Sequence, residues 1–328
     1  MKADRPPAAD NTVIILCGPT AVGKTALSMA LAKRVRAEIV CADSMVVYRG
    51  MDIGTAKPSP EEQATVPHHL VDVAEPSETF SAARFLSLAT AAIDSIIGRG
   101  RRPLVAGGTG LYVRALTRGL LDAPSGDPGI LHALEAESRV SGPETLHRRL
   151  ADVDPESARR IHFTDAKRII RALAVWMDHG VSISRLQAMQ PKPPPYDFIG
   201  ICLTRDRAEL CARINRRVDE MIAAGLVDET RRVIAGGASR AAMQALGYKE
   251  IGEYLAGRAT LDEAAEMIRS RTRRFAKRQM TWFRRETAMR FVDVTGMERA
   301  ADMLAAVLES GAEEPLWSYY SQRLNIAF

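Results

Sequence analysis

The chain has 328 residues, of which 46% are hydrophobic and 26% charged, and its formal net charge at pH 7 is +5. This balance is that of an ordinary globular protein, and the length allows one large α/β domain with a smaller appended unit. The apolar runs are too short to span a bilayer, and residues 1–12 combine acids and prolines, so we expect neither a membrane protein nor a signal peptide.

The cysteines and the basic residues further narrow the class of protein to which the chain could belong. Three of the four cysteines, Cys17, Cys41 and Cys202, lie in apolar segments that predict strands, and none forms a C-x-x-C pair. Buried free thiols fit a reducing cytoplasm and argue against a zinc site. Residues 269–285 contain eight Lys or Arg and no acid, interleaved with aromatic residues. A stretch of one sign indicates contact with a polyanion such as nucleic acid.

Strand and helix patterns alternate through the first third of the chain. Apolar β-branched runs predict strands at 12–17, 37–41, 69–73 and 103–106, and helical spacing predicts helices at 24–35, 81–97 and 110–116. Ser81 is suited to cap the second of these helices. Such alternation predicts a parallel sheet covered by helices on both faces.

The pattern changes between two breaks, a turn-rich one at 122–129 and a proline-rich one at 191–197, which enclose only helical patterns such as 155–161 and 165–179. The sheet-like pattern then resumes, with strands predicted at 198–203 and 290–294 and helices at 207–224, 226–235, 261–285 and 298–308. We therefore expect an α/β core of residues 1–121 and 197–310, an all-helical insertion domain of residues 122–196, and an unassigned tail of residues 311–328.

A phosphate-binding motif lies between the first strand and the first helix. Residues 18–25 read GPTAVGKT, which fits G-x-x-x-x-G-K-[ST] in the required context and predicts a sheet of the P-loop NTPase type. Its glycines let successive N–H groups point inward, Lys24 supplies a charge to the terminal phosphate, and Thr25 can ligate Mg²⁺. The motif predicts a diphosphate site without specifying a nucleotide, formed by Gly18, Pro19, Thr20, Ala21, Val22, Gly23, Lys24 and Thr25.

Further polar residues follow the strands at the same edge of the sheet, where open α/β sheets bind ligands. Asp43 follows the second strand, and its position alone fits a general base and a Mg²⁺ or supporting carboxylate equally well. Thr109 lies in a GGTG turn and could simply cap the next helix. Arg213 and Arg217 are one helical turn apart, which suits a solvated basic stripe or an anion clamp.

Seven further motifs then carry a resemblance along nearly the whole chain. They are DSMVVYRGMDIGTAKP at 43–58, PHHLVDV at 67–73, FSAARF at 80–85, GGTGLYVRAL at 107–116, DAKRIIRAL at 165–173, ALGYKEI at 245–251 and TRRFAKRQMTWFRR at 272–285. In this order, and together with the P-loop, they resemble the tRNA dimethylallyltransferases of bacterial type.

The resemblance implies a reaction and its partners. It implies transfer of a dimethylallyl group from dimethylallyl diphosphate to N6 of the adenosine 3′ of the anticodon, position 37, in tRNAs that read codons beginning with U. The products are N6-(dimethylallyl)adenosine and diphosphate. Mg²⁺, a cytoplasmic location, a monomeric state and no membrane are implied with it.

The resemblance also assigns roles to residues. Asp43 becomes the general base, Thr109 holds the amine or a diphosphate oxygen, and Arg217 clamps the leaving diphosphate, with Lys57 a weaker candidate for that clamp. The implied tRNA-binding residues are Asp43, Ser44, Met45, Val46, Thr109, Leu131, Lys167, Arg168, Ile169, Ile170, Arg171, Gln244, Ala245, Leu246, Gly247, Tyr248, Lys249, Arg274, Lys277, Arg278 and Gln279. Tyr248 and Gln279 are expected to support extruded bases, and Trp282 either joins that surface or packs in the core.

Two features depart from the family pattern. Leu131 stands where bacterial members often carry Arg, and the tail from Gly311 matches nothing in the family. The chain also lacks the C-terminal zinc finger of the eukaryotic enzymes, which favours the bacterial type.

Three other functions share parts of this pattern. A small-molecule P-loop kinase would need an Arg-rich lid and no basic aromatic helix. An RNA-binding GTPase-like switch would need N-K-x-D, which the sequence does not contain. An adenylate prenyltransferase acts on free AMP, and the helical insertion and the basic stretch favour tRNA over that small substrate.

Overall fold

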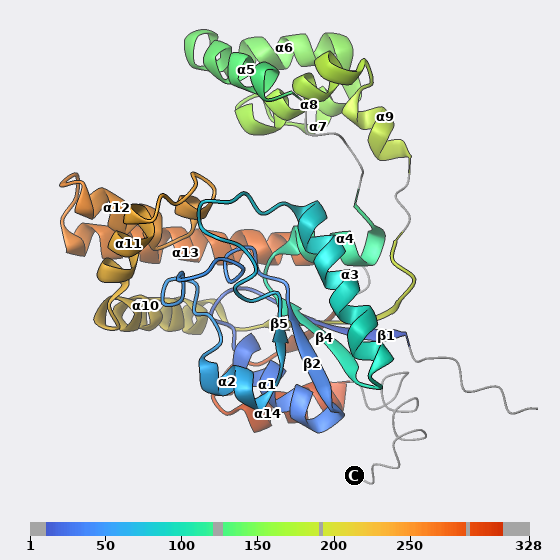
Figure 1. Cartoon of the computed structure of the whole chain (residues 1–328), viewed down its shortest axis with the longest axis vertical. Coiled ribbons are helices and arrows are strands. Elements are labelled where there is room, and N and C mark those ends of the chain that lie inside the picture. The colour runs from blue at the N-terminus through green and yellow to red at the C-terminus, as the bar shows by residue number, and fades with distance from the viewer. Residues whose placement is uncertain (1–10, 121–126, 190–192, 287–288, 311–328) are drawn as a thin grey trace, which may run out of the picture. The chain divides into compact units, whose positions relative to one another are not determined.

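The structure is a computed structural model that describes residues 11–120, 127–189, 193–286 and 289–310 (Figure 1). The chain divides into two compact units. The first is formed by the described residues of Met1–Thr117 and Pro194–Phe328, and the second is Arg118–Pro193. The insertion was predicted at residues 122–196, and the predicted tail of residues 311–328 lies outside the described residues.

The first unit is built on one six-stranded parallel sheet in the order β3-β2-β4-β1-β5-β6. The strands are β1 (Thr12–Cys17), β2 (Ala37–Cys41), β3 (His68–His69), β4 (Arg102–Gly107), β5 (Asp197–Thr204) and β6 (Met289–Asp293). Strand β1 shows why its sequence is apolar throughout. Ile14 and Leu16 enter the core on one face of the sheet, while Val13, Ile15 and Cys17 enter the core on the other.

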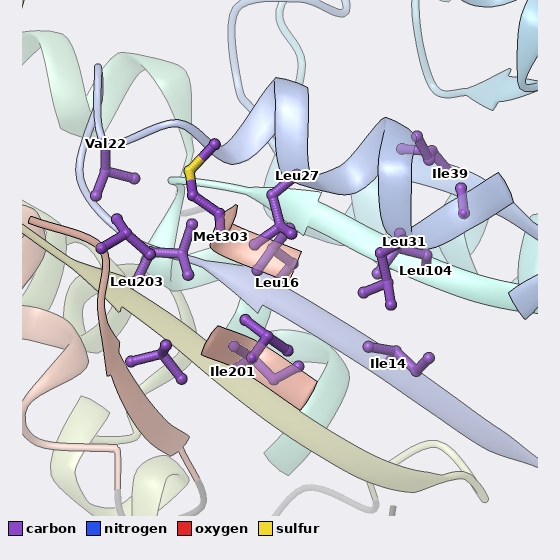
Figure 2. Packing of buried hydrophobic residues seen from close by; sticks show 14 of the residues in the cluster. Ile14, Leu16, Val22, Leu27, Leu31, Ile39, Leu104, Ile201, Leu203 and Met303 are labelled. Atoms are coloured by element: carbon purple, nitrogen blue, oxygen red, sulfur yellow. The ribbon is translucent and has the colours of Figure 1, made fainter. Parts of the chain in front are cut away.

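Helices cover both faces of this sheet. Figure 2 shows Leu27 of α1 (Lys24–Val35) and Met303 of α14 (Ala300–Ser310) packed with Leu16 in the core of one face. Helices α3 (Ala82–Gly98) and α4 (Gly110–Arg118) cover the other face, where Phe85 and Tyr112 stack with ring centroids 3.9 Å apart. Both cores are layers of interdigitated apolar side chains, as a doubly covered parallel sheet requires.

A group of helices in the first unit encloses a third apolar core. They are α10 (Arg207–Ala223), α11 (Leu226–Ala235), the 3₁₀ turn η1 (Ala242–Gln244), α12 (Tyr248–Leu255) and α13 (Leu261–Phe283). The short helix α2 (Pro60–Thr65) has no residue in this core. Helices α10 and α13 run side by side (Figure 1). Val47 and Met51, which follow β2, pack into this core with Val218 of α10 and Ile268 of α13. The segment after β2 is thereby fixed against these helices.

The second unit is entirely helical in its described residues. Its helices are α5 (Pro128–Ser141), α6 (Pro143–Val153), α7 (Pro155–Arg160), α8 (Ala166–His179) and α9 (Ile183–Ala188). Proline begins three of them, a position at which its missing N–H costs nothing, and Asp127 and Asp154 cap two of those three. Leu134, Leu150 and Leu173 belong to a core that is the unit's own.

The predicted fold class, a P-loop-like parallel sheet with flanking helices, is confirmed. Strand β1, strand β2 and helices α1 and α11 have the predicted bounds. The predicted strand 69–73 was wrong beyond its first residue, because Leu70 and Asp72 take left-handed backbone conformations at φ 64° and 55° that end the extended run. The short helix α12 was not among the predicted helices.

One glycine tests the packing of β4 against β2. Alanine at Gly107 would place its Cβ 2.1 Å from the carbonyl oxygen of Ala42, which is backbone and cannot swing away. We expect Gly107→Ala to lower the free energy of unfolding by about 3 kcal/mol, measured by urea denaturation. Gly98→Ala is the control, because Gly98 ends a helix with open space around it, and this change should raise stability by roughly 0.5–1 kcal/mol. Equal midpoints for the two variants would contradict the close approach of Gly107 to Ala42.

Candidate active site

The P-loop connects β1 to α1 at the carboxyl edge of the sheet. Gly18 and Gly23 have φ values of 145° and 117°, and a Cβ on Gly18 would meet the carbonyl oxygen of Leu203 at 2.8 Å. Lys24 Nζ donates to the carbonyl oxygens of Gly18 at 3.0 Å and Pro19 at 2.8 Å. Burial lowers the pKa of Lys24 to about 8, an effect that the negative charge of Asp43 opposes. The loop therefore holds an ammonium group ready for an anion.

Gln279 fixes this loop to the neighbouring turn. Its Oε1 accepts a hydrogen bond from Thr20 N at 2.9 Å, and its Nε2 donates to the carbonyl oxygen of Gly108 at 2.8 Å. A Cβ on Gly108 would lie 2.3 Å from that Nε2, so the contact requires glycine. Gln279 was predicted to support an RNA base, and that role stays a prediction; in this structure Gln279 is 7% exposed and both ends of its amide are hydrogen-bonded.

Asp43 and Thr109 come together where β2 and β4 end. Asp43 Oδ1 accepts from Met45 N at 2.9 Å, and Thr109 Oγ1 accepts from Ser44 N at 3.1 Å. Thr109 N also donates to the carbonyl oxygen of Ala42 at 3.2 Å. The Thr109 hydroxyl thus holds the segment that carries Asp43. The Asp43 carboxylate is itself oriented by the hydrogen bond from Met45 N.

Arg213 and Arg217 of α10 have different surroundings. Arg213 Nε donates to the carbonyl oxygen of Ala21 at 3.0 Å, and its guanidinium pairs with Glu298 at 2.5 Å, so Arg213 braces the P-loop. Arg217 makes no hydrogen bond or ion pair with any residue in the described part of the chain. Desolvation lowers the pKa of Arg217, and the charge of Asp43 opposes this. An enclosed guanidinium beside the P-loop is suited to bind an anion.

Two adjoining cavities meet at these residues. The larger, of about 310 Å³, is here called the central cavity, and the smaller, of about 130 Å³, the P-loop cavity. Both are lined by Thr20, Asp43, Thr55, Arg217 and Phe275. Lys24 and Thr25 line only the P-loop cavity, whereas the central cavity continues along an apolar wall that includes Met45, Ile214, Val218, Met221, Ala245, Leu246 and Ile268. The two cavities therefore form a charged end and an apolar end, and the carboxylate of Asp43 and the guanidinium of Arg217 border both.

Several of the predicted tRNA-binding residues are on the surface. Arg274, Lys277 and Arg278 are exposed on α13, and Lys167 and Arg168 are exposed on α8 of the second unit. Gln244 and Lys249 are exposed before and in α12, where Lys249 Nζ lies 3.5 Å from Gln244 Oε1. Ser44 and Met45 line the central cavity, while the buried Val46 lines the P-loop cavity. Arg171 is partly buried, and desolvation lowers its pKa.

Other residues predicted to contact tRNA are buried or partly buried in this structure, and that role stays a prediction for each of them. Ile169 and Ile170 belong to the core of the second unit, against which Leu131 also packs. Gly247 is buried too, since it forms the tight turn that leads into α12. Tyr248 is fully buried and donates its phenol hydrogen to Glu229 Oε1 at 2.6 Å.

Lys57 and Trp282 have partners within the chain. The side chain of Lys57 is 4% exposed, and its ammonium donates to the carbonyl oxygen of Tyr48 and to Asp72, which favours a structural role over the predicted diphosphate clamp. The Trp282 ring packs against Gly110, where a Cβ would come within 2.3 Å of it, and beneath the guanidinium of Arg114 at 4.4 Å. Of the two alternatives for Trp282, this contact favours core packing.

Comparison with known proteins agrees with this arrangement. A profile described as IPP transferase matches residues 46–286. The chain belongs to the IPP transferase family. It is 51% identical over 288 residues to the tRNA dimethylallyltransferase of Symbiobacterium thermophilum, covering 87% of this chain and 90% of that protein. It is 47% identical over 292 residues to that of Geobacillus thermodenitrificans, covering 88% and 92%.

Solved structures agree with the sequence relatives. The tRNA isopentenylpyrophosphate transferase of Bacillus halodurans superposes with a TM-score of 0.67 at 41% identity, covering 92% of this chain and 99% of that one. A eukaryotic dimethylallyltransferase acting on tRNA superposes with a TM-score of 0.77 at 26% identity, covering 97% and 81%. The family resemblance inferred from the seven motifs is confirmed.

Some residues shape the site through contacts that are distant in the chain and were not predicted. Gln279 and Thr20, which are hydrogen-bonded, are 259 residues apart. Gly54 and Thr55 line the central cavity, although no role was predicted for either of them. Glu229, which holds that segment, carries no local signal either.

The lowered pKa of Lys24 predicts a proton-linked binding step. An anionic ligand favours the ammonium form, so the pKa rises on binding and the protein takes up a proton. At pH 8 about half of the free protein carries a neutral Lys24, and we expect uptake of about 0.5 proton on binding dimethylallyl diphosphate, falling at pH 7. Calorimetry in buffers of different ionisation enthalpy measures this number.

The controls separate Lys24 from other titrating groups. Lys24→Arg keeps a cation that does not titrate in this range and should bind without uptake, while Lys33→Met, at the exposed far end of α1, should behave like the unmodified protein. Unchanged uptake in Lys24→Arg would show that another group takes the proton.

Proposed function

We propose that this chain transfers the dimethylallyl group of dimethylallyl diphosphate to N6 of adenosine 37 in tRNAs reading codons that begin with U. The observation that carries the proposal is the pair of adjoining cavities. A P-loop ammonium and a guanidinium lie at one end, an apolar wall at the other, and Asp43 borders both. The relatives are named for the same reaction.

The chemistry follows from the lining residues. The N6 lone pair is delocalised into the adenine ring, so N6 needs a close approach to C1 and a proton acceptor. The N6–C1 bond forms as the bond from C1 to the diphosphate oxygen breaks, and the N6 proton passes to Asp43. Lys24 and Arg217 stabilise the charge that develops on the leaving diphosphate. The apolar wall holds the dimethylallyl chain and excludes water.

Mg²⁺ would fit at the phosphate end. Thr25 is exposed and lines the P-loop cavity, and within the described residues no cluster of three His, Cys, Asp or Glu could form a metal cage. Mg²⁺ commonly takes few protein ligands and completes its shell with phosphate oxygens and water. Thr25 would therefore hold the ion, which would neutralise charge on the diphosphate.

The tRNA is bound by exposed cations. Arg274, Lys277 and Arg278 lie on α13, whose buried Gln279 holds the P-loop, so phosphate contacts on this helix lie close to the reaction site. In the second unit, Lys167 and Arg168 offer further contacts to the anticodon stem-loop. We expect the chain to be active as a monomer. No helix among the described residues has the length and apolarity needed to cross a membrane.

The reaction is tested directly on tRNA. Incubation with the protein, Mg²⁺ and dimethylallyl diphosphate should add one prenyl unit to adenosine 37, detected by mass spectrometry of nuclease digests. Free AMP is the competing acceptor. Modification of AMP and not of tRNA would overturn the proposal.

Asp43 is tested by an isosteric change. Asp43→Asn keeps the shape of the side chain and removes the proton acceptor, so both substrates should still bind while single-turnover transfer slows by about 10²–10⁴-fold. Rapid-quench measurements with saturating substrates give this rate. A near-normal rate would assign Asp43 a structural or metal-supporting role instead.

The cations of α13 are tested through salt dependence. Each phosphate contact removed lowers the slope of log K against log salt by roughly 0.7–0.9, so the double variant Arg274→Ala/Arg278→Ala should bind tRNA with a shallower slope. Its affinity for dimethylallyl diphosphate should not change. The double variant Lys33→Ala/Arg34→Ala, which removes two exposed cations at the end of α1, is the control. Equal slopes in both double variants would mean that Arg274 and Arg278 face only solvent.

A further inference from the structure

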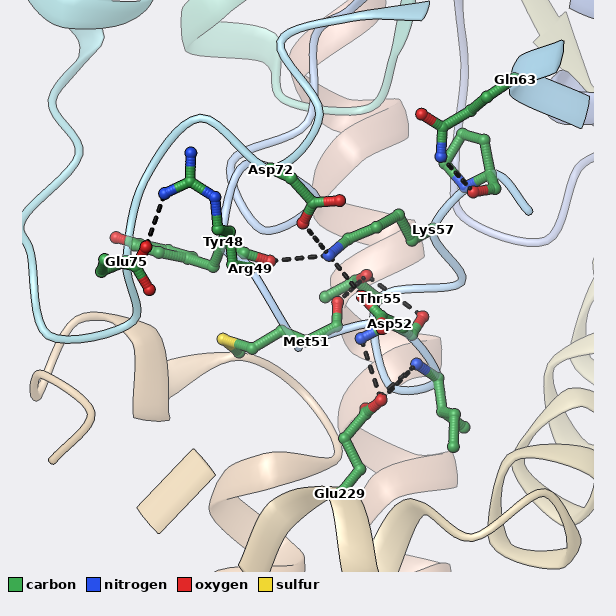
Figure 3. A network of polar contacts seen from close by, with 12 residues as sticks. Tyr48, Arg49, Met51, Asp52, Thr55, Lys57, Gln63, Asp72, Glu75 and Glu229 are labelled. Atoms are coloured by element: carbon green, nitrogen blue, oxygen red, sulfur yellow. Dashed lines mark hydrogen bonds and ion pairs between the residues drawn. The ribbon is translucent and has the colours of Figure 1, made fainter. Parts of the chain in front are cut away.

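A buried carboxylate holds the loop that follows β2. Glu229 of α11 is 2% exposed and accepts hydrogen bonds from three successive backbone amides, Asp52 N at 3.0 Å (drawn in Figure 3), Ile53 N at 2.9 Å and Gly54 N at 3.1 Å. Burying a charge is costly unless hydrogen bonds satisfy it. Three peptide N–H groups that converge on one carboxylate satisfy its buried charge and also fix the conformation of the loop.

Tyr248 of α12 completes this arrangement. Its hydroxyl donates to the same carboxylate at 2.6 Å, and its ring packs against Gly54, where a Cβ would lie 2.4 Å from a ring carbon. Burial, and then the contact with Glu229, raises the pKa of Tyr248, so the phenol stays a donor. Glu229 therefore joins the loop after β2 to the first residue of α12.

The other end of the same loop is held by Lys57. Its ammonium donates to Asp52, to Asp72 and to the carbonyl oxygen of Tyr48, all drawn in Figure 3. Residues 52–57 are thus fixed at both ends by buried groups of opposite charge. The middle of the loop, Gly54 and Thr55, is the part that lines the central cavity.

The two segments that Glu229 joins are two walls of one cavity. Gly54 and Thr55 line the central cavity from the loop, and Gln244, Ala245 and Leu246 line it from the segment before α12. We infer that Glu229 and Tyr248 are positioning residues that set the distance between these two walls. Resting on the proposed function, this inference means that they align the acceptor adenine with the allylic carbon without touching either substrate.

The kinetic test uses variants that keep the volume of each side chain. Glu229→Gln leaves at least one loop amide without an acceptor, and Tyr248→Phe removes one donor. A displacement of about 1 Å can cost roughly 100-fold in rate. We expect kcat on tRNA to fall at least about tenfold in Glu229→Gln and less in Tyr248→Phe. The dissociation constant for inorganic diphosphate should stay within about twofold, since the P-loop and Arg217 are on other segments.

Thr230→Val is the matched control. Thr230 is buried, adjoins Glu229 on α11, and donates its hydroxyl hydrogen to the carbonyl oxygen of Leu226 within the same helix. Its removal disturbs helix α11 without touching the loop, so kcat should be unchanged. The double variant Glu229→Gln/Tyr248→Phe should be no slower than Glu229→Gln alone, because the two side chains act as one unit. Additive losses, or an equal loss in Thr230→Val, would overturn the inference.

A second readout does not depend on catalysis. Hydrogen exchange at the amides of Ile53 and Gly54 should accelerate in Glu229→Gln, while amides in α1 should be unaffected. If the unmodified protein fails to prenylate tRNA and these amides still respond, the proposed function fails and the loop contact stands. If the exchange rates do not respond, Glu229 does not hold the loop and the inference fails.

Discussion

The side-chain amide of Gln279 is the contact on which the active site depends. It is both donor and acceptor, so one side chain satisfies Thr20 N of the P-loop and the carbonyl oxygen of Gly108 at the end of β4. No apolar or singly functional side chain could make both bonds. Gln279 belongs to α13, whose exposed residues carry the cations proposed to bind RNA phosphates. A displacement of α13 would therefore be transmitted through Gln279 to the loop proposed to hold the diphosphate.

The cationic groups around this contact are arranged to bind an anionic ligand. Lys24 and Arg217 are both withdrawn from solvent, and for both the desolvation lowers the pKa while Asp43 opposes it. Without a ligand, Lys24 is satisfied by two carbonyl oxygens of its own loop, which are weaker partners than phosphate oxygens. A diphosphate would replace these partners without rearranging the loop, because Gly18 and Gly23 already hold the backbone in its curled conformation. Such preorganisation is how enzymes stabilise a leaving group.

Features that depend on residues close together in the chain could be predicted from the sequence. The surroundings of side chains whose partners are distant in the chain could not. The P-loop, the strand before it and the helix after it follow from one local motif, as do the positions of Asp43 and Thr109 at the sheet edge. Tyr248 and Gln279 look like surface residues in a polar, basic context, yet Glu229 and Thr20 bury them. Lys57 was predicted as a candidate for the diphosphate clamp for the same reason, since its contact with Asp72 exists only once the loop has folded. Ile169 and Ile170 were predicted to contact RNA through the family resemblance, whereas in the folded helix α8 both side chains belong to the core of the second unit.

The helices that stand beyond the carboxyl edge of the sheet explain why a P-loop protein would use a prenyl diphosphate. A kinase has to bind the phosphates of two polar substrates, so its P-loop would face a lid of arginines. Here the P-loop cavity opens instead onto side chains such as Ile214, Val218 and Ile268, which form the apolar wall contributed by α10 and α13. A hydrocarbon chain gains free energy by leaving water for such a wall, at about 0.8 kcal/mol per buried CH₂, whereas a second phosphate would lose its hydration without compensation. The charge of the substrate therefore fixes which end enters the P-loop, and the apolar wall then directs its allylic carbon toward Asp43.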